Sequence, residues 1–64
     1  LMTIREQLLR AVIERNRLEY EIVRTVERGT VVGPDSPLSR DLEKVRTRIH
    51  RLRRTVEETA YNRV

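Results

Sequence analysis

The 64-residue sequence contains no cysteine, phenylalanine or tryptophan, and it has only one histidine, two glycines and two prolines. Without cysteine it can form neither a disulfide framework nor a thiolate metal site. The single histidine, His50, excludes a histidine-rich metal centre and fits a structural or surface role. The longest unbroken apolar run has three residues, which is too few to cross a bilayer. We therefore expect a cytoplasmic protein without a metal, a cofactor or a membrane segment.

The small size of the chain limits the hydrophobic core that it can build. Hydrophobic residues make up 38% of the sequence, and charged residues make up the same share. Domains this short bury a modest fraction of their surface and commonly need a disulfide, a metal or a partner chain. Since neither a disulfide nor a metal is expected, we expect association with another chain to supply the missing stability.

The first half of the sequence has the signals of one long helix. No glycine or proline occurs from Ile4 to Arg28, and good helix formers dominate this stretch. Thr3 followed by Glu6 fits a capping box, in which each side chain binds an unpaired backbone amide at the helix start. Gly29 lies where a left-handed residue commonly ends a helix. These signals predict a helix over 4–28.

A glycine- and proline-containing stretch, GTVVGPDS, follows the first helix and predicts a loop over 29–36. Ser36 before Pro37 is typical of a helix start, and no further breaker follows, so we predict a second helix over 37–62. Two helices of nearly equal length joined by a short loop predict a single all-α domain, an antiparallel hairpin.

Apolar residues repeat in both predicted helices in alternating steps of four and three residues, which is the pattern of a coiled coil. In the second helix this row is Leu38, Leu42, Val45, Ile49, Leu52, Val56 and Thr59. In the first helix the equivalent row is Ile4, Leu8, Ala11, Arg15, Leu18, Ile22 and Thr25. We therefore predict a two-helix antiparallel coiled-coil hairpin in which these two rows face each other.

The first helix carries more apolar surface than one helix–helix contact can cover. A lone hairpin would leave the surplus in water, whereas a second hairpin, forming a four-helix bundle, or a groove on another protein would bury it. We favour the homodimer and keep a second protein as the alternative partner. The predicted interface residues are Leu9, Val12, Ile13, Asn16, Tyr20 and Val23.

Two polar residues, Arg15 and Asn16, interrupt the apolar surface midway along the first helix. In one interpretation the Arg15 stem lies on the helix–helix contact and its guanidinium reaches outward towards Glu19. In the other, these polar residues fix register and orientation in a bundle.

The second half of the chain carries most of the net charge of +4, with eight basic and five acidic residues in 33–64 against six and five in 1–32. Four basic residues have few acidic neighbours and are candidates to contact nucleic acid or another anion: Lys44, Arg46, Arg48 and Arg51. The alternative, which we favour, is an ordinary solvated helix flank. No aromatic residue occurs in 40–54 that could stack on a base.

The segment Ser39–Val45, SRDLEKV, resembles the signature of the Spo0E-like aspartyl-phosphate phosphatases, small helical hairpins that dephosphorylate a sporulation response regulator. Ser39 and Leu42 match that signature, Glu43 stands where the family has Asp, and the resemblance covers 13–49. The resemblance implies that Ser39 and Glu43 would form a phosphatase surface.

A second resemblance lies in the basic part of the second helix. Val45, Arg46, Ile49, Arg51 and Arg53 are similar to the second helix of ribosomal protein uL29, a basic helical hairpin on ribosomal RNA. This similarity implies contact with RNA.

Spacing alone gives no catalytic constellation, because Asp41 and Glu43 are two residues apart and point in different directions on a helix. We therefore predict a non-enzymatic protein-interaction module that self-associates and serves as a regulatory or assembly factor. The alternatives are a Spo0E-like phosphatase and a hairpin that binds RNA or DNA through its second helix.

Overall fold

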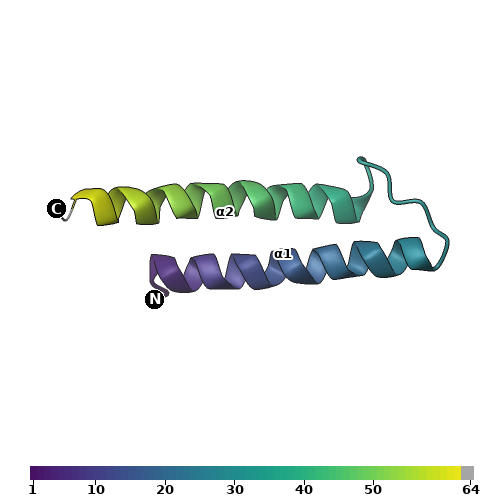
Figure 1. The fold of residues 1–64 in the computed structure, drawn as a ribbon, viewed down its shortest axis with the longest axis horizontal. Helices are drawn as coiled ribbons and strands as arrows, with labels where there is room; N and C mark the ends of the chain where they lie inside the picture. The colour runs from purple at the N-terminus through teal and green to yellow at the C-terminus, as the bar shows by residue number, and fades with distance from the viewer. Residues whose placement is uncertain (63–64) are drawn as a thin grey trace.

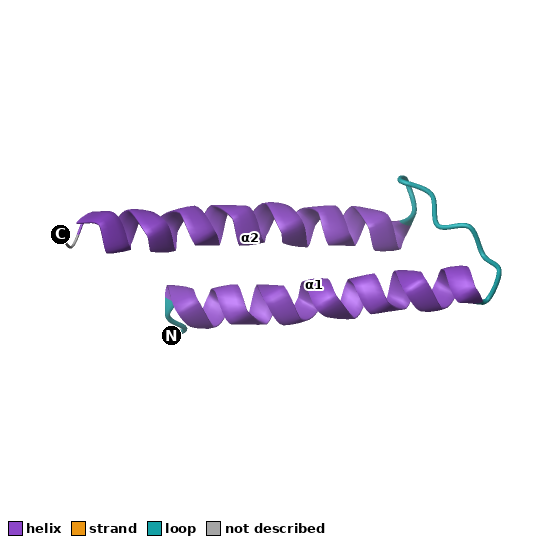
Figure 2. Cartoon of the chain, viewed as in Figure 1, coloured by secondary structure: helices purple, strands orange, loops and turns teal. Residues whose placement is uncertain are grey.

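The computed structural model describes residues 1–62, with side chains through residue 60, and consists of two helices. Helix α1 spans Ile4–Glu27 and helix α2 spans Pro37–Asn62. The two helices lie side by side and run in opposite directions, and the loop joins them at one end (Figure 1). Helix and loop are the only kinds of structure in residues 1–62 (Figure 2). The predictions of an all-α fold and of a helical hairpin are therefore confirmed.

Both ends of α1 are capped by local hydrogen bonds. The Thr3 hydroxyl accepts a hydrogen bond from the Glu6 amide at 3.1 Å. The reciprocal bond, in which the Glu6 carboxylate accepts from the Thr3 amide, is not among those of the described residues. At the other end, the amides of Gly29 and Thr30 donate to the carbonyls of Val26 and Thr25, which is the Schellman arrangement. Gly29 has a φ of 89°, so this turn requires the left-handed conformation that glycine adopts without strain.

A turn and a serine cap precede helix α2. The Ser36 amide donates to the Gly33 carbonyl, which closes a turn directly before α2. The Ser36 hydroxyl then accepts from the Ser39 amide at 3.2 Å, as expected of an N-cap residue. These bonds explain why the helix begins at Pro37, where the lack of an amide hydrogen costs nothing.

The core lies along the line where the two helices meet. We call the two rows predicted above the inner row of α1 and the inner row of α2. All four buried residues of the described chain belong to them: Ala11, Leu18, Leu42 and Ile49. Most other members are half-buried, whereas Ile4 and Thr59, at the open end of the hairpin, are exposed. The two inner rows therefore face each other, as the spacing predicts.

The described chain measures 51 × 19 × 18 Å, so it is a rod two helices wide. At about 1.5 Å per residue, the 24 residues of α1 and the 26 of α2 are each shorter than this rod. The last turns of α2 extend beyond the start of α1 (Figure 1). A rod of this width has one layer of contact, which leaves the remaining surface of each helix free.

Candidate interaction surface

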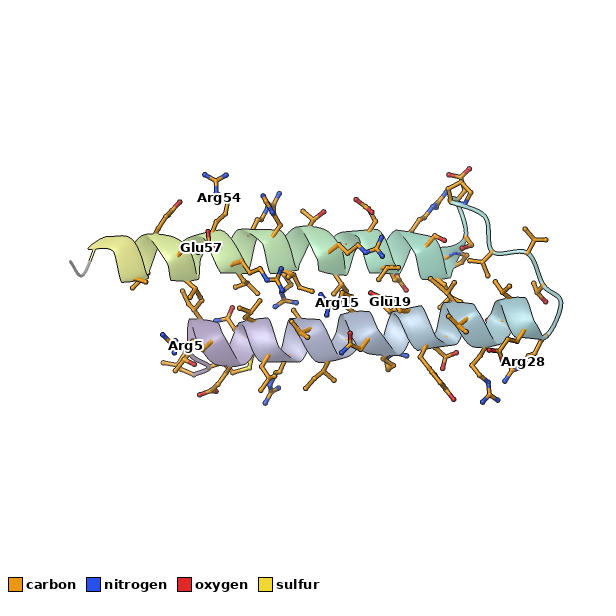
Figure 3. All side chains as sticks on the ribbon, viewed as in Figure 1. Arg5, Arg15, Glu19, Arg28, Arg54 and Glu57 are labelled. Carbon is orange, nitrogen blue, oxygen red and sulfur yellow. The ribbon has the colours of Figure 1, made fainter. Side chains whose placement is uncertain are left out.

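The side of α1 turned away from α2 carries a second row of large residues, which we call the outer face: Leu9, Ile13, Asn16, Tyr20 and Val23. Its four apolar side chains are 60%, 58%, 60% and 52% exposed for Leu9, Ile13, Tyr20 and Val23, respectively. At about 100° per residue, this row lies about 150° around the helix from the inner row. Figure 3 shows side chains projecting from α1 on the side away from α2, where no other element of the described chain lies. The hairpin therefore leaves the outer face uncovered.

The six residues predicted as an interface do not all lie on the same face of α1. Val12 is half-buried, between the inner row and the outer face, whereas Asn16 is exposed within the outer face. The Asn16 Oδ1 accepts hydrogen bonds from Arg15 Nε at 3.4 Å and Nη2 at 3.2 Å. The outer face is thus an apolar strip with one polar residue near its middle.

Arg15 is half-buried and lies between the helices, with Glu19 beside it (Figure 3). Its Nε lies 3.5 Å from Glu19 Oε1. The stem therefore occupies the inner row while the guanidinium reaches Glu19 and Asn16, as the first of the two interpretations describes.

Tyr20 is held in place by a contact with Arg24 that was not predicted from the sequence. Its hydroxyl accepts a hydrogen bond from Arg24 Nη1 at 3.1 Å, and the guanidinium carbon of Arg24 lies 5.7 Å from the ring centroid. This contact fixes the orientation of the largest side chain of the outer face. The signal in the sequence was the four-residue spacing of a tyrosine and an arginine.

Large exposed apolar side chains are confined to α1 and to the segments that flank it, within the described residues. The outward surface of α2 is polar and charged, with Arg54 pointing away from α1 (Figure 3). An apolar partner would therefore contact α1 rather than α2.

The four basic residues predicted to contact anions are all exposed but do not form one surface. Arg48 lines a groove with Glu14 and other residues on one side of the helix–helix contact, and Arg46 lines a groove on the other side. Lys44 and Arg51 lie four and three residues from Arg48 and share its flank. The structure thus groups three of these residues and separates Arg46 from them.

The groove at Arg46 is lined mainly by basic side chains. It has a volume of about 370 Å³ and is lined by Arg15, Glu19, Arg46, Ile49, His50 and Arg53. Three arginines, a histidine and one carboxylate therefore line the same groove. Spacing along one helix does not reveal this group, because Arg15 comes from α1 and the other basic residues come from α2.

The flank that holds Arg48 also contains an ion pair within α1. Arg17 Nη2 lies 2.6 Å from Glu14 Oε1, and a second bond joins Arg17 Nε to Glu14 Oε2 at 3.1 Å. Hydrogen bonding by the Arg17 guanidinium lowers the pKa of the Glu14 carboxyl below its ordinary value of 4.5. The Glu14 carboxylate is therefore held by Arg17 of its own helix rather than by a basic residue of α2.

The two residues implied by the phosphatase resemblance lie in the first two turns of α2. The Ser39 hydroxyl donates to the Gly33 carbonyl at 2.8 Å and accepts from the Ser36 hydroxyl at 3.0 Å. Glu43, one turn further on, is exposed. Ser39 thus helps to hold the turn that begins α2, and its hydroxyl is occupied by that contact.

An apolar groove of about 420 Å³ lies at the open end of the hairpin, lined by Thr3, Ile4, Arg5, Val56, Thr59 and Ala60. It arises because α2 extends beyond the first turn of α1 (Figure 1).

Within residues 1–62, no group of three or more metal-ligating side chains comes together. Neither helix, as far as it is described, has an apolar stretch long enough to cross a membrane.

Comparisons of the chain with protein-family models, with curated proteins and with solved structures found no match. The resemblances to the Spo0E-like phosphatases and to ribosomal protein uL29 therefore stay predictions. Among the surfaces described above, the outer face of α1 has the largest set of exposed apolar side chains in one row.

Proposed function

We propose that this chain is a non-enzymatic protein-interaction module that pairs with a second copy of itself and acts as a regulatory or assembly factor. The observation that carries the proposal is the outer face of α1, where four large apolar side chains are each more than half exposed. Removing apolar surface from water gains roughly 25 cal/mol per Å². Contiguous exposed apolar patches mark contact sites in small proteins.

A second copy is the partner that this surface fits most simply. The hairpin has only four buried residues among those described, so it has a small core of its own. Pairing two outer faces places apolar side chains against apolar side chains and adds a second layer to that core. The polar surface of α2 stays in water in such a pair.

The proposal is tested by sedimentation velocity across a micromolar concentration series, comparing the wild-type chain with Ile13→Asp. We expect the wild-type mass to double as concentration rises, and we expect Ile13→Asp to stay monomeric because it places a charge in the outer face. Thr47→Asp is the matched control, since it also introduces an aspartate, but at an exposed position of α2. A compact wild-type monomer at every concentration would refute self-association.

A second candidate function, binding to the phosphate backbone of RNA, is favoured by the groove that brings Arg15, Arg46 and Arg53 together. Fluorescence anisotropy with a labelled RNA duplex would then show affinity that falls steeply with salt. Arg46→Gln would weaken binding. Arg54 lies outside this groove and pairs with Glu58, so Arg54→Gln would have less effect. Absence of binding at low salt would reject this function.

A further inference from the structure

The outer face of α1 is arranged almost symmetrically around Asn16. Leu9 lies seven residues before it and Val23 seven residues after it. Ile13 lies three residues before it and Tyr20 four residues after it. When two identical helices pack antiparallel, a two-fold axis crosses their contact. A residue that lies a given number of positions before the axis in one copy therefore meets the residue that lies the same number of positions after the axis in the other copy. A row with apolar residues at equal or nearly equal distances on both sides of its centre suits that arrangement.

Charged residues at the two ends of α1 follow the same symmetry. Arg5 lies eleven residues before Asn16, and Glu27 lies eleven residues after it. Both are exposed, and neither takes part in the ion pairs found within residues 1–62. An antiparallel pair centred on Asn16 places Arg5 of each copy near Glu27 of the other. A parallel pair in register instead places Glu27 against Glu27 and Arg5 against Arg5, which is repulsive.

The angle between the two faces of α1 sets where α2 lies in such a pair. The outer face is about 150° from the inner row, so the partner and α2 contact nearly opposite sides of α1. In a square four-helix bundle the two neighbours of each helix lie about a quarter turn apart. The pair is therefore a flatter arrangement, in which the two α1 helices lie in the centre and the two α2 helices outside them.

We propose that two copies pack antiparallel through the outer faces of their α1 helices, with both Asn16 residues at the two-fold axis and Arg5 of each beside Glu27 of the other. This inference rests on the proposed function, because it requires self-association. The occupant of the outer face is a second copy, since this chain itself carries the complementary charges at the matching distances.

The first test exchanges the charges at the two ends of α1. In the antiparallel pair, Arg5→Glu or Glu27→Arg alone replaces two attractive contacts by two repulsive ones, and each weakens the dimer about five-fold or more at low salt. The double exchange, R5E together with E27R, restores wild-type affinity. Both exchanges suit the helix dipole, because they place an acid in the first turn and a base in the last. A loss of dimer is therefore not a loss of helix.

The second test measures orientation directly with a nitroxide spin label. The chain has no native cysteine, so Arg28→Cys gives one labelling site per chain and leaves Arg5 and Glu27 intact. In the antiparallel pair the two labels lie twelve residues either side of the axis, about 36 Å apart. In a parallel pair they lie at about the interhelical distance, roughly 10 Å. Electron–electron double resonance distinguishes these separations.

The outcomes separate the orientation from the proposed function. A dimer with widely separated labels, weakened by either single exchange and restored by the double exchange, supports the antiparallel pair. A dimer with closely spaced labels, or one indifferent to all three exchanges, overturns the antiparallel pair and leaves self-association intact. A wild-type chain that stays monomeric overturns both.

Discussion

Truncating Ile13 to alanine removes three carbon atoms from the outer face, and the cost to self-association can be worked out from its exposure. A fully buried methylene contributes about 0.8 kcal/mol, so three contribute about 2.4 kcal/mol. Because the side chain is 58% exposed in the hairpin, pairing buries the remaining half or so and gains about 1.4 kcal/mol per copy. With two copies in the dimer, Ile13→Ala weakens it by about 2.8 kcal/mol, which is about 100-fold in Kd.

Sedimentation equilibrium of the wild type and the variant measures this difference directly. Alanine has a higher helix propensity than isoleucine, so the substitution does not weaken α1 itself. Val31→Ala is the control, because Val31 is 90% exposed in the loop and lies outside the outer face. We expect this control to leave the Kd unchanged. A Kd for Ile13→Ala within about two-fold of the wild type would refute the role of the outer face in pairing.

Three further predictions concern the hairpin itself. Gly29→Ala is expected to lower the free energy of unfolding by about 1–2 kcal/mol, because alanine is strained at a φ of 89°. The control Gly33→Ala is expected to be neutral or slightly stabilising, and chemical denaturation compares the two variants. Leu18→Ala removes the most buried side chain of the described chain and is expected to cost about 2–4 kcal/mol in the same assay, far more than Ile13→Ala does in the monomer. Arg17→Gln is expected to return the lowered pKa of Glu14 towards 4.5, which NMR titration of the carboxyl carbon measures. In the wild type, the stabilisation by the Arg17–Glu14 pair is present above pH 4.5 and is lost as pH falls through the lowered pKa. The variant loses this part of the pH dependence of stability, whereas the control Arg15→Gln keeps it.

The pairing of the two inner rows could be predicted from the sequence because a helix repeats its faces at a fixed interval. Leu18, Leu42 and Ile49 are buried where the alternation of four and three residues puts them. Gly29 likewise has the left-handed conformation that its position predicts. The predicted end of the first helix was one residue late, because Arg28 is the capping residue that follows Glu27.

Contacts that depend on how one helix is placed against the other were beyond the sequence. Spacing along α2 groups Arg46 with its basic neighbours, but the structure puts it in a groove with Arg15 of α1. The offset of the two helices along their axes decides such groupings, and periodicity does not specify it. Ser39 was assigned by resemblance, yet its hydroxyl is bound by the turn that precedes α2, which is a feature of the loop conformation.

The loop between the helices is fastened at both ends, by Gly29 and Thr30 on one side and by the bonds between Gly33 and Ser36 on the other. Val31, at 90% exposure, lies between these two anchored ends. A short peptide tag or a fluorophore introduced at this residue would project into solvent at the closed tip of the rod, and the caps that start and stop the helices would be kept. The tip is therefore the natural handle for attaching the hairpin to a surface or following it in a cell.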